Sequence, residues 1–163
     1  MMLFCISLPA QELSLDQIRS GFSQAVQEER SCTDLHSCLI KSFDTANAVL
    51  MAYHGTVTVT MAKYTSNPFL KYQYFTDGKS LLERSVMKDP KNLEIRFLRL
   101  TVQEHTPGFL GYNEQIPDDK KYILEHLENL NLPQLKKAII NYISVSNYFS
   151  ETEKKWAANL KSS

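Results

Sequence analysis

The sequence predicts an all-α fold of about seven antiparallel helices joined by short connections. Three observations support this prediction. Apolar residues recur at helical spacing along most of the chain, and capping residues or prolines stand at nearly every break in that pattern. Glycine is scarce, with five residues in the chain, which disfavours both turn-rich β folds and glycine-rich phosphate loops.

Length and charge narrow the class of protein. The chain has 163 residues, which suits one ordinary domain, and 43% of them are hydrophobic, enough to build a core. Lysine plus arginine equals aspartate plus glutamate at 18 each, whereas nucleic-acid-binding proteins usually carry a basic excess. No apolar run approaches the ~18 residues that a membrane-spanning helix needs. We therefore expect no nucleic-acid partner and no membrane span.

The first ten residues form an apolar segment that differs from the polar sequence starting at Gln11. Residues 1–10 have the character of a signal-peptide remnant cleaved after Ala10, although no basic residue precedes Arg19 and Leu8 stands where a small residue is expected. The alternative is a short apolar arm packed on the domain. The first interpretation predicts a periplasmic or secreted protein whose residues 11–163 form a single helical domain, and the alternative is a cytoplasmic protein.

Capping signals place the first two helices. Ser14 and Gln17 have the spacing of a capping box, and the helix that they begin is predicted to end near Arg30. Thr33 is expected to cap the second helix. The apolar stripe of this second helix is predicted to consist of Leu35, Leu39, Phe43, Ala46, Leu50 and Tyr53.

Residues 56–61 alternate threonine with apolar side chains, which taken alone favours a strand. Residues 69–75 would be the hairpin partner of that strand. An isolated hairpin in an otherwise helical chain has no sheet to join. We therefore interpret residues 56–61 as a continuation of the second helix, which Pro68 is predicted to end.

Five further helices are predicted in the rest of the chain, each marked by a cap, a proline or the start of an apolar stripe. Their expected starts lie near Tyr74, Asn92, Pro117, Pro133 and Ser150.

Particular residues also resemble known patterns. Gly78, Leu82, Ser85 and Pro90 fall at the offsets of the second half of a tetratricopeptide repeat, and this segment resembles that repeat. Residues 62–64, 67–69, 94–99, 103–104 and 109–113 together resemble an uncharacterised family of small exported bacterial helical proteins, and the resemblance covers residues 53–130. These resemblances imply a tetratricopeptide-like α-α superhelix, a helix over residues 56–61 and export of the chain. They imply no particular chemistry.

The loop of residues 107–113 is the first candidate binding site, because exposed aromatic side chains on a rigid scaffold often contact partners. Phe109, Tyr112 and Asn113 would then bind the partner. Alternatively, Phe109 and Tyr112 pack beneath the loop as a small satellite of the core.

Tyrosines and arginines supply the other candidate binding residues. Arg96 and Arg99 flank apolar residues and could be binding hot spots or exposed charges on an amphipathic helix. The resemblance to the exported helical family, which includes both arginines, implies that at least one is a partner in a buried ion pair. Four tyrosines either line a groove between helix pairs or belong to the core: Tyr53, Tyr64, Tyr72 and Tyr74.

No pattern in the sequence points to catalysis or to a metal. Cys32 and His36 are spaced to share a helix face, but zinc needs further ligands, and the chain has no CxxC or HExxH motif. A disulfide from Cys32 to Cys38 would require Cys32 to lie outside the helix. Asp118 and Asp119, as helix neighbours, should point apart and be solvated charges that favour the helix N-terminus. We predict no catalytic residue, no metal site and no cofactor.

These patterns favour a non-enzymatic module that binds a protein or peptide in a helix-lined groove. Two alternatives remain open. One is a small exported enzyme or ligand-binding protein that uses His36, Cys38 or the 107–113 loop, which would need a deep pocket with convergent polar groups. The other is a purely structural envelope protein whose groove is filled by its own terminal helix.

Overall fold

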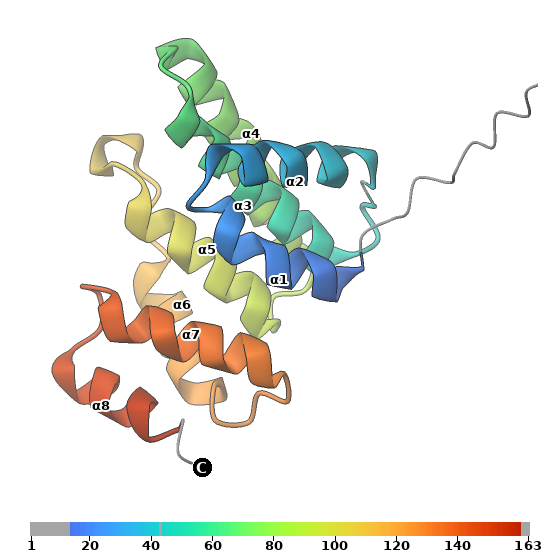
Figure 1. Ribbon diagram of the computed structural model, residues 1–163. Coiled ribbons are helices and arrows are strands. Elements are labelled where there is room, and N and C mark those ends of the chain that lie inside the picture. Colours follow the sequence, from blue (N-terminus) through green and yellow to red (C-terminus); the bar gives the residue numbers. More distant parts are fainter. Residues whose placement is uncertain (1–13, 43, 161–163) are drawn as a thin grey trace, which may run out of the picture.

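The computed structural model describes residues 14–42 and 44–160, which form eight α-helices and one short 3-10 helix (Figure 1). No strand occurs in this described part of the chain, so the all-α prediction is confirmed, and residues 56–61 are helical as expected. The helices are α1 (Leu15–Ala25), α2 (Glu29–Lys41), α3 (Ala48–Tyr64), α4 (Pro68–Lys88), α5 (Leu93–His105), η1 (Gly108–Leu110), α6 (Ile116–His126), α7 (Pro133–Val145) and α8 (Glu151–Asn159).

The segment from Thr33 to Tyr64 holds parts of two helices where the sequence predicted one. The carboxylate of Asp44 accepts a hydrogen bond from the backbone N–H of Ala46 at 2.7 Å, and the side chain of Asn47 caps α3. Such local side-chain bonds compete with the backbone bonds that would continue a helix. The break between α2 and α3 raises the number of helices from about seven to eight.

The boundary between α1 and α2 also differs from the prediction. α1 ends at Ala25 rather than near Arg30. Just after it, the carbonyl of Gln24 accepts the backbone N–H groups of Gln27 and Glu28, which form a turn. α2 begins at Glu29, so Thr33 is not its cap. The Thr33 hydroxyl instead donates to the Glu29 carbonyl at 2.9 Å within the helix, as threonine commonly does.

Pro68 begins a helix rather than only ending one. α4 starts at Pro68, earlier than the predicted start near Tyr74, and the side chain of Asn67 accepts hydrogen bonds from the N–H groups of Phe69 and Leu70 at 2.9 and 3.4 Å. Proline suits a first helical turn because its φ is already helical and its missing N–H would have no acceptor there. Residues 69–75 are therefore helical, not a strand.

Other helix starts agree with their sequence signals. The capping boxes of Ser14 with Gln17 and of Ser150 with Glu153 are both formed. Asn92 caps α5 as predicted. Each of these caps satisfies backbone N–H groups that the first turn of a helix leaves without an intrahelical partner.

α5 lies between α1 to α4 on one side and α6 to α8 on the other (Figure 1). It contributes to two hydrophobic clusters, one shared with α1 to α4 and the other with α6 to α8. The α5 residues of the first cluster are Ile95, Leu98 and Val102, and those of the second are Leu93, Phe97 and Leu100. Two of its faces are therefore apolar, and the charged side chains between them must find partners within the protein.

α3 and α4 make the most extensive helix–helix contact, and they cross where two glycines face each other. A Cβ atom on Gly55 would lie 2.7 Å from the carbonyl oxygen of Gly78, and one on Gly78 would lie 2.5 Å from the carbonyl oxygen of Gly55. The two backbones can approach this closely because neither residue has a side chain. This contact fixes the position of α4, whose outer face carries the site described below.

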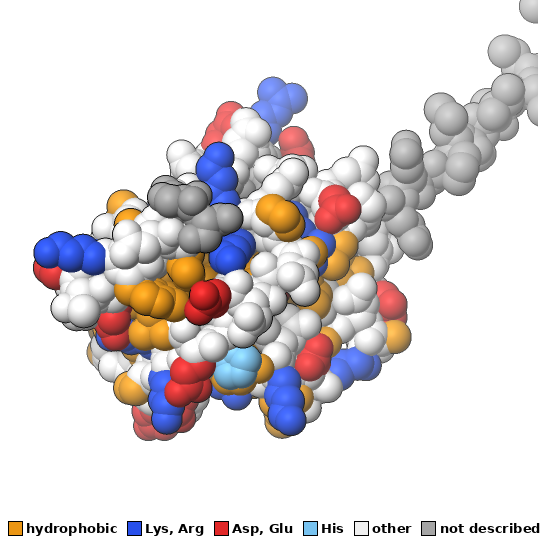
Figure 2. All heavy atoms as spheres, turned by 90° about the horizontal axis from the view of Figure 1, so that it is seen from below, with side chains coloured by type: hydrophobic (Ala, Val, Ile, Leu, Met, Phe, Trp, Pro, Cys, Tyr) orange, Lys and Arg blue, Asp and Glu red, His pale blue; other side chains and the backbone are white. Residues whose placement is uncertain are grey.

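No helix in the described part of the chain is both long and apolar enough to cross a membrane. The predicted signal-peptide remnant, residues 1–10, lies outside the described residues. Figure 2 views the molecule from the end at which α7 and α8 lie, and acidic and basic side chains are interspersed on this face rather than separated by sign.

Candidate functional site

A cavity of about 480 Å³ opens between α4 and the loop that contains η1. We call it the α4–η1 cavity. Its lining residues are Tyr72, Phe75, Thr76, Lys79, Ser80, Glu83, Phe109 and Leu110. The α4 members recur at spacings of three and four residues, so one face of α4 forms one wall. η1 supplies the opposite wall.

The 3-10 turn presents Phe109 at the mouth of the cavity. Gly111 has a left-handed φ of 60°, and its N–H donates to the carbonyl of Gly108 at 3.1 Å. Glycine adopts this conformation without steric cost. The reversal leaves Phe109 88% exposed, while Leu110 is half-buried. Phe109 is therefore held in solvent by a hydrogen-bonded turn.

Two exposed aromatic side chains on α4 extend the apolar surface. Tyr72, which lines the cavity, is 60% exposed, and Phe69 is 74% exposed. Phe69 lies three residues before Tyr72 on the helix, so both side chains belong to the same side of α4. Together with Phe109 they form an exposed aromatic surface, and such surfaces often mark interaction sites.

Tyr112 packs beneath the loop, which was the alternative to binding for this residue. It is 3% exposed, its ring makes an edge contact with Phe75, and its hydroxyl donates to Glu83 Oε1 at 2.6 Å. Burial and the Glu83 carboxylate both raise the pKa of the Tyr112 hydroxyl. Tyr112 therefore anchors the loop on α4, and Phe109 is the aromatic side chain that faces solvent.

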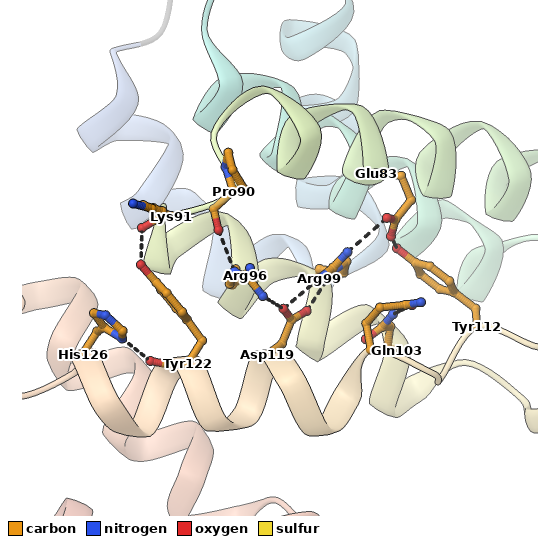
Figure 3. Close-up of polar contacts among 11 residues, drawn as sticks. Glu83, Pro90, Lys91, Arg96, Arg99, Gln103, Tyr112, Asp119, Tyr122 and His126 are labelled. Carbon is orange, nitrogen blue, oxygen red and sulfur yellow. Dashed lines mark hydrogen bonds and ion pairs between the residues drawn. The ribbon is translucent and has the colours of Figure 1, made fainter.

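Arg96 and Arg99 form a buried ion-pair network with Asp119 (Figure 3). Both arginines project from α5 toward α6. Arg99 donates from Nε and Nη2 to the two Asp119 oxygens at 2.7 and 2.8 Å, and Arg96 Nη1 donates to Oδ1 at 2.8 Å. Arg99 also donates to Glu83 at 3.0 Å, which connects the network to the cavity wall. The arginines therefore act as structural ion-pair partners in this arrangement.

The prediction that Asp118 and Asp119 are both solvated is wrong for Asp119. Asp118 is exposed in the first turn of α6, but Asp119 has no exposed surface. Neighbouring side chains on a helix point about 100° apart, so the pair divides between solvent and the α5 contact. A buried carboxylate is stable only when its charge is balanced, which the two arginines provide.

Tyr53 belongs to a second buried network on the other side of α5. It is 3% exposed, and its hydroxyl donates to Glu94 Oε1 at 2.8 Å. Arg19 of α1 donates to both Glu94 oxygens at 2.8 and 2.6 Å, in the bidentate geometry that arginine favours. Tyr53 is therefore a core residue here rather than part of a groove.

The remaining predicted binding residues do not line the α4–η1 cavity. Tyr64 is half-buried at the end of α3, with the ammonium group of Lys63 5.4 Å from its ring centre. Asn113 is exposed at the end of the 107–113 loop, and its carbonyl accepts the N–H of Ile116 at 3.4 Å. Of the sequence-predicted residues, the structure brings Phe109 and Tyr72 together at one cavity.

Of the cysteines and histidines of α2 and α3, Cys32 is buried, and Cys38, His36 and His54 are half-buried. Cys32 and Cys38 are free thiols, and burial raises the pKa of the Cys32 thiol to about 11. The rings of His36 and His54 lie 5.7 Å apart, and His36 contacts the hydroxyl of Thr58 at 3.2 Å. No group of three metal-ligating side chains occurs among residues 14–42 and 44–160.

The histidine pair predicts a loss of stability in mild acid. Burial and the nearby His36 lower the pKa of His54 from 6.5 to about 4, so the unfolded chain binds more protons between these values. Stability should therefore be retained above pH 6.5 and fall as pH decreases toward 4, by up to about 1.4 kcal/mol per pH unit. Urea unfolding across this range would measure the slope. A His54→Gln variant should show a smaller slope, and an unchanged slope would contradict the assignment.

Sequence reasoning missed Lys79, Glu83, Thr76 and Ser80 as cavity residues. Their spacing relative to Tyr72 could have shown that they share a helix face. The 107–113 loop covers this face because Tyr112 contacts α4. This is a tertiary contact, and the local sequence carries no signal for it.

Comparison of the chain with protein-family models, curated proteins and solved structures found no match. The class of this protein is therefore described by its structure alone. It is an all-helical protein with a cavity between α4 and the η1 loop that is bordered by aromatic side chains.

Proposed function

We propose that this protein is a non-enzymatic module that binds a segment of a protein partner at the α4–η1 cavity. One observation carries the proposal: Phe109 and Tyr72, which are 88% and 60% exposed, flank a cavity of about 480 Å³. Exposed aromatic side chains beside a pocket are typical of interaction hot spots, because they bury large apolar areas on binding.

The internal contacts of the two walls support this proposal. The backbone of Phe109 lies in the hydrogen-bonded η1 turn, and the loop is anchored by the hydrogen bond from Tyr112 to Glu83. α4 is held by its glycine contact with α3. A preformed surface of this kind loses little conformational entropy on binding, so more of the contact energy appears as affinity.

The scaffold and location complete the proposal. We infer a tetratricopeptide-like α-α superhelix from the positions of Gly78, Leu82, Ser85 and Pro90. We infer a periplasmic or secreted location from the apolar character of residues 1–10. Solenoids of this type commonly present surfaces that hold partner segments.

A crosslinked pull-down with the purified chain tests this function. We expect one stoichiometric partner, identified by mass spectrometry, whose affinity falls at least about tenfold in Phe109→Ala and in Tyr72→Ala. Met87→Ala is the matched control, because Met87 is 75% exposed on α4 but does not line the cavity. Equal capture by wild type and Phe109→Ala, or capture of no partner, would overturn the proposal.

A further inference from the structure

We propose that the α4–η1 cavity recognises a peptide carboxylate next to an apolar side chain, with Lys79 as the anion-binding residue. This inference rests on the proposed function and names the chemistry of the partner segment. It follows from the charge balance of the cavity wall.

Lys79 lacks the ion pair that its position on the helix would normally provide. Glu83 stands four residues later on α4, which is the usual spacing for a surface ion pair. Glu83 has other partners in the structure, however: Oε1 accepts the Tyr112 hydroxyl at 2.6 Å, and Oε2 accepts Arg99 Nη1 at 3.0 Å. Within residues 14–42 and 44–160, no carboxylate forms an ion pair with Lys79.

Aromatic rings hold the ammonium group of Lys79 at the cavity instead. Lys79 Nζ lies 4.8 Å from the ring centre of Tyr112 and 6.0 Å from that of Phe75. Ring faces attract a cation, but they do not occupy its N–H donors. A half-buried ammonium whose donors remain available is a favourable place for an anion.

The acidic residues of α4 leave room for an anion at Lys79. Residues 68–76 contain Lys71 and no aspartate or glutamate, and Asp77 and Glu83 follow them. Glu83, which lines the cavity, is paired with Arg99. Phe75, Phe109 and Leu110 form apolar walls next to Lys79. A carboxylate at Lys79 would therefore place a neighbouring aromatic or aliphatic side chain of the same peptide between α4 and Phe109.

Small probes can separate charge recognition from apolar binding. The full chain would be titrated by two-dimensional NMR with N-acetylphenylalanine and with its neutral carboxamide. We expect the carboxylate to bind about fivefold more tightly, as a partly exposed charged hydrogen bond would give. Lys79→Gln should remove this preference without changing the affinity of the carboxamide, and Phe109→Ala should weaken both probes.

A control variant and a second probe pair complete the test. Lys71→Gln removes an exposed positive charge from α4 outside the cavity and should leave the preference intact. Acetyl-Phe-Asp-amide compared with acetyl-Phe-Asn-amide tests a side-chain carboxylate, whereas N-acetylphenylalanine represents a chain terminus. A preference shown by either pair and lost in Lys79→Gln supports the inference.

Three results would overturn the carboxylate inference: equal affinity within both probe pairs, no binding of any probe, or a preference that survives Lys79→Gln. The proposed function fails on a different result, namely partner capture that is unaffected by Phe109→Ala. Capture that depends on Phe109 but not on Lys79 would therefore leave the binding function intact and remove only the carboxylate.

Discussion

Asp119→Ala is expected to lower the free energy of unfolding by about 3–5 kcal/mol. Asp119 has no exposed surface, and its two oxygens balance the charges of Arg96 and Arg99. Removing the carboxylate would leave two guanidinium groups in the contact between α5 and α6, and only Arg99 would retain an anion, Glu83. The energetic cost lies mainly in the unbalanced buried charge rather than in the lost packing.

Urea unfolding followed by circular dichroism would measure this effect, with the neighbouring residue as control. Asp118 has the same side chain in the same helical turn but is exposed. Asp118→Ala should cost less than about 1 kcal/mol, since an exposed carboxylate near a helix N-terminus contributes only weakly. Equal losses in the two variants would show that Asp119 is solvated and that the network does not stabilise the fold.

Gly78→Ala is expected to cost about 3 kcal/mol of unfolding free energy, near the upper end for an overpacked site. The added Cβ would meet the carbonyl oxygen of Gly55 at 2.5 Å and the backbone nitrogen of Val59 at 2.8 Å. These atoms belong to the backbone of α3 and cannot rotate away, so the two helices must separate. The gain in helix propensity from alanine, about 1 kcal/mol, offsets only part of this loss.

Gly21→Ala is the matched control for Gly78→Ala. Gly21 lies within α1, and a Cβ there would meet no atom within 4 Å. Alanine should therefore stabilise the protein by about 0.5–1 kcal/mol through helix propensity alone. The same unfolding measurement compares both variants. Stabilisation by both substitutions would mean that α3 and α4 do not cross at their glycines.

Local signals in the sequence predicted the class of fold and several helix starts. The capping boxes at Ser14 and Ser150 act within one turn, so no tertiary information is needed to find them. The break between α2 and α3 was missed because the apolar stripe appeared to run through it. The signal that the stripe concealed was the pair of Asp44, whose side chain accepts the N–H of Ala46 in the connection, and Asn47, which caps α3.

The candidate site was less predictable, because burial is decided by contacts between distant segments. Phe109 and Tyr112 are three residues apart in one loop, yet the first is 88% and the second 3% exposed. Their exposures differ because the Tyr112 hydroxyl donates a hydrogen bond to Glu83 on α4, which holds the Tyr112 ring under the loop. The same reasoning applies to Asp119, whose burial depends on arginines of α5.

The placement of α5 between two hydrophobic clusters separates the parts of this protein that are free to vary from those that are not. Nine of the thirteen α5 residues are buried, charged ones included, so most substitutions there disturb one of the two clusters or a buried polar contact. The cavity wall, by contrast, includes side chains that no packing contact constrains as strongly, above all the exposed Tyr72 of α4 and Phe109 of η1. Under the proposed function, divergence among homologues should concentrate on the exposed cavity residues Tyr72 and Phe109 rather than on buried α4 residues such as Gly78.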